Sequence, residues 1–179
     1  MTERTAVQKP ILKYANEIGW EIVSRPDAEA MRGFSPSSID IQERARNASL
    51  FFADILYQKA KEFNPKLEDT KEELVRKLTI LQGSIQGNRD FLAYLRGEKT
   101  FFSKQDNREY NLTLIDFTNP ENNIYQVTDE YYCFNGRYGN REDIIFFING
   151  IPLVVIECKN ATLDEALAIG IDQLRRYHN

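Results

Sequence analysis

The chain has 179 residues, of which 42% are hydrophobic, which is enough to form one domain with a sizeable core. Its formal net charge of −4 argues against strong DNA affinity over the whole surface, although binding depends on local patches of charge. Because the sequence has no apolar run of membrane-spanning length, no signal-peptide segment and no glycine-rich Walker loop, we expect a soluble cytoplasmic protein without an ATP site of its own.

The first hundred residues read as a helical region. In residues 3–18 the apolar positions recur at steps of three and four, and Gly19 follows as a stop signal. A loop is expected through Arg25-Pro26 and Ser35-Pro36. Further helices are predicted near residues 47–63, 69–81 and 88–96, with Gly83 and Gly87 as breaks between the last two.

After residue 110 the hydrophobic pattern changes from helical to strand-like. Strands are predicted at residues 111–116, 124–128 and 131–134, with turns over residues 119–123 and 136–140. A last helix is expected over residues 164–177, with Leu167, Ile171 and Leu174 facing inward. The predicted fold class is therefore α/β, with helices around a mixed central sheet.

Residues 143–159 are the most informative stretch. Two strongly apolar runs flank Asn149-Gly150, a dipeptide that is typical of a tight β-hairpin turn. Glu157 and Lys159 lie two residues apart, so they share one face of the second strand. The start of one hairpin strand lies beside the end of the other, so Asp143 is expected close to both.

This arrangement brings two carboxylates and an ammonium group to one end of an apolar hairpin. Charges beside buried strands are costly unless they are paired or bind a metal ion. Asp143 and Glu157 are ligands that suit Mg²⁺, and Lys159 could orient a water molecule and stabilise charge on a phosphate. The alternative is a strand end at which the lysine merely neutralises two acids.

The remaining reactive and basic side chains are less informative. Cys133 and Cys158 are expected to be buried free thiols, and the single His178 offers no cluster for zinc. Several basic residues lie near the predicted site in the sequence, and they either contact DNA or are ordinary solvated charges. These residues are Arg137, Arg141, Lys159, Arg175 and Arg176.

Several motifs resemble one known family. Asp143, followed fourteen positions later by Glu157 and then by Lys159, is similar to the D…ExK motif of PD-(D/E)xK nucleases. The wider context resembles the N-terminal nuclease domain of type I restriction enzyme R subunits over nearly the whole chain. The other segments that carry this resemblance are Val7-Gln8-Lys9-Pro10, Gly19-Trp20, Gly87-Asn88-Arg89, Leu95-Arg96-Gly97, Asn111 through Asp116, Arg141-Glu142-Asp143, residues 149–153 and residues 173–178.

The resemblance implies a restriction-endonuclease-like core with an N-terminal helical region. It makes Asp143, Glu157 and Lys159 catalytic, with the two acids binding Mg²⁺. Gln173 and Tyr177 would form a Q-x-x-x-Y element on one helical face beside the active site, although a helix pair that hydrogen-bonds to the sheet explains the same spacing. Further candidates are Glu3 and Gln8, because related nucleases often add an acid from an early helix, and the DNA contacts Arg141, Arg175 and Arg176.

The implied function is a Mg²⁺-dependent endonuclease domain that cleaves double-stranded DNA within a type I restriction complex, together with modification and specificity subunits. Residues 1–179 would form a single domain, helical to about residue 100 and β-rich from about 108 to 179. It is expected to be the N-terminal fragment of a longer chain whose motor binds ATP, and to be weakly active or inactive alone. The alternatives are a stand-alone PD-(D/E)xK nuclease in DNA repair or recombination, and a non-catalytic docking or DNA-binding module.

Overall fold

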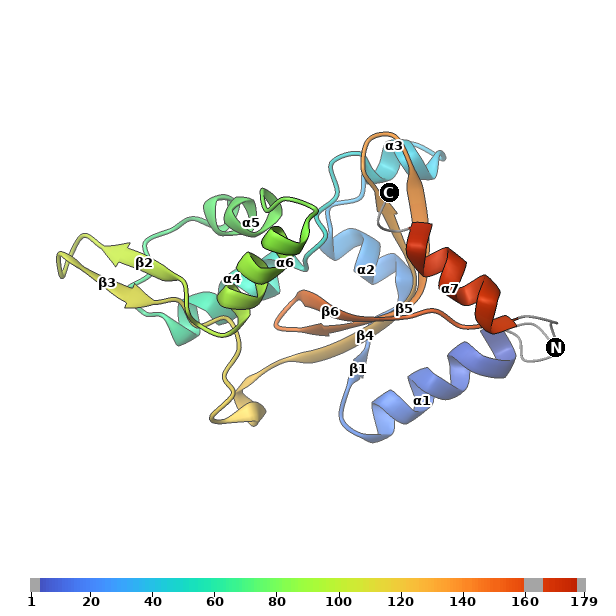
Figure 1. Ribbon diagram of the computed structural model, residues 1–179, viewed down its shortest axis with the longest axis horizontal. Coiled ribbons are helices and arrows are strands. Elements are labelled where there is room, and N and C mark those ends of the chain that lie inside the picture. The colour runs from blue at the N-terminus through green and yellow to red at the C-terminus, as the bar shows by residue number, and fades with distance from the viewer. Residues whose placement is uncertain (1–3, 160–165, 177–179) are drawn as a thin grey trace. The chain divides into compact units, whose positions relative to one another are not determined.

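The computed structural model describes residues 4–159 and 166–176 (Figure 1). The chain divides into two compact units, and we describe each by itself. The first unit comprises Met1–Leu50, Tyr125–Phe147 and Pro152–Asn179, and the second comprises Phe51–Ile124 and Ile148–Ile151. None of the described helices is long and apolar enough to cross a membrane.

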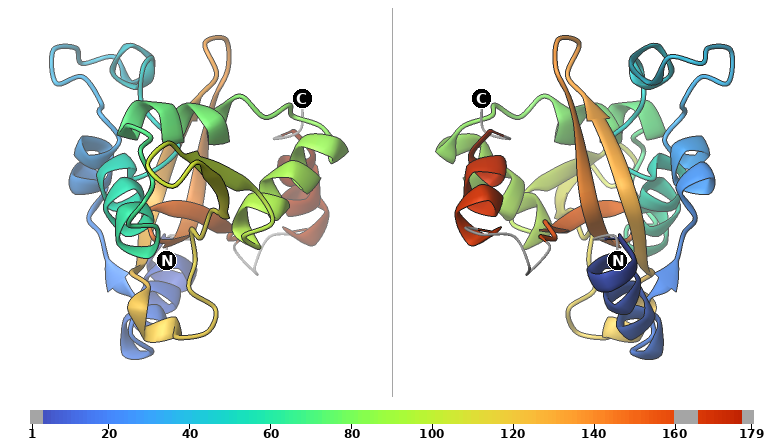
Figure 2. Two further views of the ribbon diagram at one scale, coloured as in Figure 1. Left: turned by 90° about the vertical axis from the view of Figure 1, so that its left-hand side faces the viewer. Right: turned by 90° about the vertical axis from the view of Figure 1, so that its right-hand side faces the viewer.

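A four-stranded sheet organises the first unit. The strand order is β1-β4-β5-β6, and β1 runs parallel to β4, with Glu21 opposite Gln126. Figure 2 shows α2 and α7 on opposite sides of the β4–β5 ribbon. The predicted α/β class, with helices flanking a mixed sheet, is confirmed. The elements are η1 (Arg4–Gln8), α1 (Lys9–Glu17), β1 (Glu21–Ile22), α2 (Arg25–Met31), α3 (Ile41–Ala45), β4 (Tyr125–Phe134), β5 (Gly139–Ile148), β6 (Ile151–Ile156) and α7 (Ala166–Arg176).

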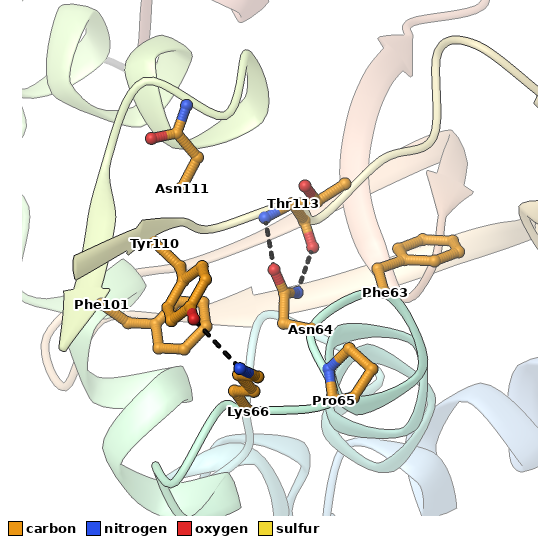
Figure 3. Close-up of a pocket in the computed structure, with 8 residues that line it drawn as sticks. All are labelled: Phe63, Asn64, Pro65, Lys66, Phe101, Tyr110, Asn111 and Thr113. Carbon is orange, nitrogen blue, oxygen red and sulfur yellow. Dashed lines mark hydrogen bonds between the residues drawn. The ribbon is translucent and has the colours of Figure 1, made fainter. Parts of the chain in front are cut away.

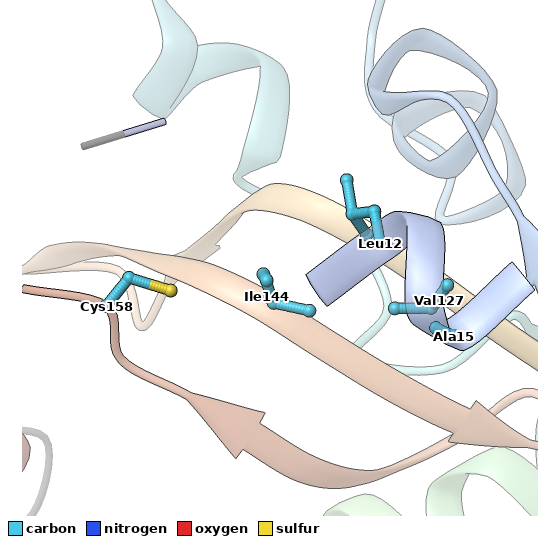
Figure 4. Packing of buried hydrophobic residues seen from close by; sticks show 5 residues of the cluster. All are labelled: Leu12, Ala15, Val127, Ile144 and Cys158. Atoms are coloured by element: carbon cyan, nitrogen blue, oxygen red, sulfur yellow. The ribbon is translucent and has the colours of Figure 1, made fainter. Parts of the chain in front are cut away.

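Helix α1 covers the sheet beneath the predicted site. Leu12 and Ala15 pack with Val127, Ile144 and Cys158 in one buried cluster (Figure 4). Ile144 follows the candidate acid of β5, and Cys158 separates the candidate acid and lysine after β6. Cys158 is buried, as predicted, whereas Cys133 is only half-buried, and the described residues hold neither in a disulfide bond. The apolar side of this end of the sheet is therefore covered by a helix.

The early helices depart from the sequence prediction. The first helix is confirmed, but it opens with the π-helical turn η1. The loop predicted through Arg25-Pro26 is wrong, because α2 begins there. The Ser24 hydroxyl accepts a hydrogen bond from the Asp27 amide, and Pro26 is tolerated in a first turn, where its missing N–H has no partner to lose. The short helix α3, capped by Asp40, was not predicted either.

The second unit is built from three helices and a β-hairpin among its described elements. Helix α5 begins with a capping box between Thr70 and Glu73, within the predicted range 69–81. The helix predicted from residue 47 begins only at Ala53, and Gly87 lies inside α6 rather than before it. The elements are α4 (Ala53–Phe63), α5 (Lys71–Thr79), α6 (Ile85–Leu95), β2 (Thr100–Ser103), β3 (Arg108–Asn111) and the 3-10 turn η2 (Pro120–Asn122).

The strand predicted at residues 111–116 is wrong. Strand β3 ends at Asn111, and β2 pairs with it in an antiparallel ribbon. The backbone beyond it is buried but bonds to side chains: Asn64 accepts from the Thr113 amide, and Asn123 accepts from the Asp116 amide. Side-chain amides thus replace the neighbouring strand that the apolar pattern suggested.

The predicted hairpin turn at Asn149-Gly150 is confirmed. Both residues have positive φ, 52° and 74°, as a two-residue type I′ turn requires. The two strand candidates before it are one strand, β4, in which Glu130 has a positive φ of 53°. The inward direction predicted for the last helix is wrong for Leu167 and Ile171, which are 78% and 42% exposed.

Candidate active site

The ends of the β5–β6 hairpin position the candidate acids. Asp143 lies within β5, and Glu157 follows the last residue of β6. The Oδ2 atom of Asp143 accepts a hydrogen bond from the amide nitrogen of Cys158 at 2.7 Å. Lys159 forms an ion pair with Glu157, and the side chain of Glu157 is only 3% exposed. The structure thus brings Asp143, Glu157 and Lys159 together, as the sequence predicted.

Burial sets the electrostatics of the pair of acids. It is the main cause that raises the pKa of Asp143 above its ordinary value, and the Cys158 amide opposes it. Glu157 raises the pKa of Asp143 further, through its negative charge and through a side-chain hydrogen bond. The two carboxylates are therefore close enough to repel each other when both are ionised.

The donor set fits a hard divalent cation. Two acids and one lysine leave a net charge of about −1 at a half-buried site, so the Lys159–Glu157 ion pair offsets only one of the two acids. Among the described residues, no group of three or more His, Cys, Asp or Glu side chains could hold a metal. Mg²⁺ needs no such cage, since it binds one or two carboxylates and keeps several waters.

Gln8 extends the site beyond the hairpin. Its Nε2 atom donates a hydrogen bond to Oδ1 of Asp143 at 2.9 Å. The sequence suggested Gln8 only as one of two early-helix candidates, and no local signal named its partner. Glu3, the other candidate, lies outside the described residues.

Helix α7 approaches the candidate lysine. A Cβ atom added at Gly170 would lie 3.4 Å from Cγ of Lys159, so the helix backbone passes against the lysine side chain. Gln173 belongs to the same helix, three residues further on, but its side chain and that of Arg176 lie outside the description. Tyr177 also lies outside the described residues.

Arg141 and Arg175, two of the three candidate DNA contacts, are exposed and paired with acids. Arg141 forms an ion pair with Glu130 at 2.9 Å, and Arg175 forms one with Asp172 at 3.4 Å. Exposed pairs of this kind are worth little, so a phosphate could replace the carboxylate partner. Their role in DNA binding stays a prediction.

A pocket in the second unit is a weaker candidate. It has a volume of about 270 Å³ and is lined by aromatic, polar and basic residues (Figure 3). Its polar groups already bond to one another: both ends of the Asn64 amide bond to the Thr113 backbone, and Lys66 contacts Asp106 and the Tyr110 hydroxyl. Asn64 and Lys66 are therefore already bonded within the protein, which makes this pocket a weaker candidate for a ligand site.

Fold and site together define a mixed α/β protein with a pair of acids and a lysine at the end of a hairpin. The chain belongs to the family described as type I restriction enzyme R protein N terminus, which matches residues 1–179. It is 25% identical over 178 residues, 96% of the chain, to the putative type I restriction enzyme MjaVIIIP endonuclease subunit of Methanocaldococcus jannaschii. It is 24% identical over 173 residues, 93% of the chain, to the type I restriction enzyme HindI endonuclease subunit of Haemophilus influenzae. The chain spans 16% of the length of each of these relatives.

The raised pKa of Asp143 predicts a pH-dependent effect of Asp143→Asn. Because the folded carboxyl ionises at higher pH than the unfolded one, stability is lost as the pH rises through the folded pKa. In EDTA, the Asn variant should be more stable than the wild type at pH 7.5, and the difference should shrink toward pH 4. Urea unfolding at both pH values measures it, with the exposed Asp172→Asn as control. A wild type that is more stable at pH 7.5 would contradict the assignment of the pKa shift.

Proposed function

We propose that this chain is a Mg²⁺-dependent endonuclease domain with a PD-(D/E)xK core, which cleaves double-stranded DNA as the cleavage module of a type I restriction R subunit. The observation that carries the proposal is the convergence of Asp143, Glu157 and Lys159 at one end of the β5–β6 hairpin. Membership of the R protein N-terminal family and the endonuclease names of the relatives support it.

In this proposal the two acids and the lysine of the hairpin have different roles. Asp143 and Glu157 hold the cation, which when bound would acidify a water molecule and neutralise charge on the phosphate. Lys159 orients the attacking water and stabilises the negative charge that develops on phosphorus-bound oxygens. The water oxygen bonds to phosphorus, the P–O ester bond breaks, and the leaving oxygen takes up a proton. One water is consumed for each bond cleaved.

Supporting roles go to helix α7 and to exposed arginines. The approach of the α7 backbone to Lys159 at Gly170 supports a role for this helix beside the lysine. Gln173 and Tyr177 are proposed to orient Lys159 or to contact phosphate. Arg141, Arg175 and Arg176 are proposed to contact the DNA backbone. Recognition of a particular DNA sequence, ATP hydrolysis and translocation would belong to other parts of the complex.

The chain alone should be a poor nuclease. Its net charge of −4 and the pairing of Arg141 and Arg175 with acids weaken the neutralisation of phosphates, so it should bind DNA weakly at physiological salt. Nicking of supercoiled plasmid should be weak with the 179-residue chain and strong with the assembled restriction complex. Both should stop in EDTA and resume when Mg²⁺ is restored.

Two results would redirect the proposal. Robust Mg²⁺-dependent cleavage by the chain alone, without partner subunits, would favour a stand-alone nuclease. A complex that cleaves equally well in EDTA would remove the metal from the mechanism. The non-catalytic alternative requires that cleavage by the complex be unchanged when this site is altered.

A further inference from the structure

Gln8 is a polar residue in a position that packing alone would assign to an apolar one. It closes η1 directly before α1, and Leu12 and Ala15 follow it at steps of four and three on the same helical face. Those two residues pack on Ile144, the neighbour of Asp143 in β5. The Gln8 side chain is itself only 2% exposed. The helical spacing therefore places the buried amide of Gln8 on the face that packs against the sheet, next to Asp143.

Only one half of that amide has a partner. Nε2 donates to Asp143, whereas Oε1 is buried and has no hydrogen-bond partner among the described residues. The orientation follows from the chemistry, because the Oδ1 atom of Asp143 accepts the bond and the NH₂ group is the donor of the glutamine amide. A buried acceptor without a donor destabilises the fold, a cost that an apolar residue of similar size would avoid.

We propose that Gln8 is a positioning residue of the cation site, a role that rests on the proposed nuclease function. Nε2 holds the Asp143 carboxylate, and Oε1 accepts a hydrogen bond from a water molecule of the bound divalent cation. Oε1 shares its carbon atom with Nε2, so it lies beside the carboxylate that would bind the metal. Mg²⁺ keeps several waters when carboxylates bind it, and these waters are strong donors.

A second buried glutamine provides a matched control in the same unit. Gln126 is 3% exposed, its Nε2 donates to Glu21 at 3.0 Å, and its Oε1 also has no partner among the described residues. Its carboxylate partner, however, lies on the exposed strand β1, away from the β5–β6 hairpin ends. The two glutamines therefore share burial and bonding pattern and differ in their distance from the acids Asp143 and Glu157.

The experiment measures Mn²⁺ binding by calorimetry to the 179-residue chain, without DNA. Gln8→Met keeps the volume and removes both polar atoms, and Gln126→Met does the same at the control position. We expect Mn²⁺ to bind about tenfold more weakly to Gln8→Met than to the wild type, since partners of metal-binding residues typically contribute 10- to 100-fold to metal affinity. Gln126→Met should bind Mn²⁺ as the wild type does. Thermal melts in EDTA identify any variant that fails to fold.

The outcomes separate this inference from the proposed function. Wild-type affinity in Gln8→Met overturns the role of Gln8 and leaves the nuclease site standing. A wild type that binds no Mn²⁺, or binds it equally well after Asp143→Ala, overturns both. If Gln8→Met does not fold, Gln8→Glu decides instead. Its carboxylate keeps an oxygen toward the cation, so tighter Mn²⁺ binding supports the role, and unchanged or weaker binding refutes it.

Discussion

Alanine at Asp143, Glu157 or Lys159 is expected to abolish DNA cleavage by the assembled restriction complex while the chain stays folded. The two acid variants would lose a ligand of the proposed cation, and the lysine variant would lose the charge that is proposed to stabilise the reacting phosphate. Removal of one group that stabilises transition-state charge typically lowers the rate 10²- to 10³-fold, and loss of the metal should cost at least as much. Plasmid linearisation, with ATP and Mg²⁺ present, measures the effect.

The controls for this result distinguish chemistry from assembly. ATP hydrolysis by the complex should largely survive all three substitutions, because the proposed motor lies outside this chain. Lys13→Ala removes an exposed lysine of α1, whose side chain is 78% exposed, and should leave cleavage unchanged. If complexes that carry each of the three variants still nick DNA at the wild-type rate, the assignment of the active site is wrong.

Gly150→Ala is expected to be the most damaging small substitution in the hairpin turn. Gly150 has a φ of 74°, and a Cβ atom there would lie 2.5 Å from the carbonyl oxygen of Phe52, which is backbone and cannot rotate away. The left-handed conformation and the clash together should lower the free energy of unfolding by about 2–5 kcal/mol. Urea unfolding measures the loss.

A second glycine separates strain from clash. Gly136, in the β4–β5 turn, also has a positive φ, 92°, but a Cβ atom there meets nothing within 4 Å. Gly136→Ala should therefore cost only the conformational penalty, roughly 1–2 kcal/mol. Equal losses in the two variants would show that the contact with Phe52 contributes nothing.

The turn residue before this glycine should be almost as sensitive. Asn149 is fully buried, and its amide bonds to the Leu114 carbonyl, the Asn123 side chain and the Ile124 amide at 2.8–2.9 Å. Asn149→Ala would remove the bonds to the Leu114 carbonyl and the Ile124 amide, at roughly 1–3 kcal/mol for each of these groups that finds no water, whereas Asn123 keeps its bond to the Asp116 amide. The same unfolding measurement applies.

The sequence predicted those parts of the molecule that depend on neighbours along the chain. The Asn149-Gly150 turn, the apolar runs beside it and the Glu157–Lys159 spacing are local, so the hairpin and the meeting of its end residues were predictable. The buried loop after Asn111 was not, because Asn64 and Asn123 supply its hydrogen bonds from elsewhere in the chain. Apolar composition alone cannot distinguish such a segment from a strand.

Dependence on contacts that are not local in sequence also explains the wrong predictions for the helices and the residue that was missed as a partner of Asp143. The start of α2 depends on a serine cap that outweighs the Arg25-Pro26 loop signal. The exposed Leu167 of α7 shows that helical spacing of apolar residues predicts a helix but not which of its faces is covered. The contact of Gln8 with Asp143 has no local signature, since only the packing of α1 on the sheet creates it.

Residues that meet at the candidate site are far apart in the sequence, and this separation affects when the site can form during synthesis of the chain. Gln8 and Asp143 are 135 positions apart, and β1 and β4 are joined by a bond that spans 105 positions. At 5–20 residues per second, a ribosome takes roughly 7–27 seconds to add the residues that separate the first pair. Contacts that close such long loops are slow to form. A nascent chain therefore carries no assembled candidate site until both ends of the first unit have emerged, and the proposed nuclease activity would begin only when this region has folded.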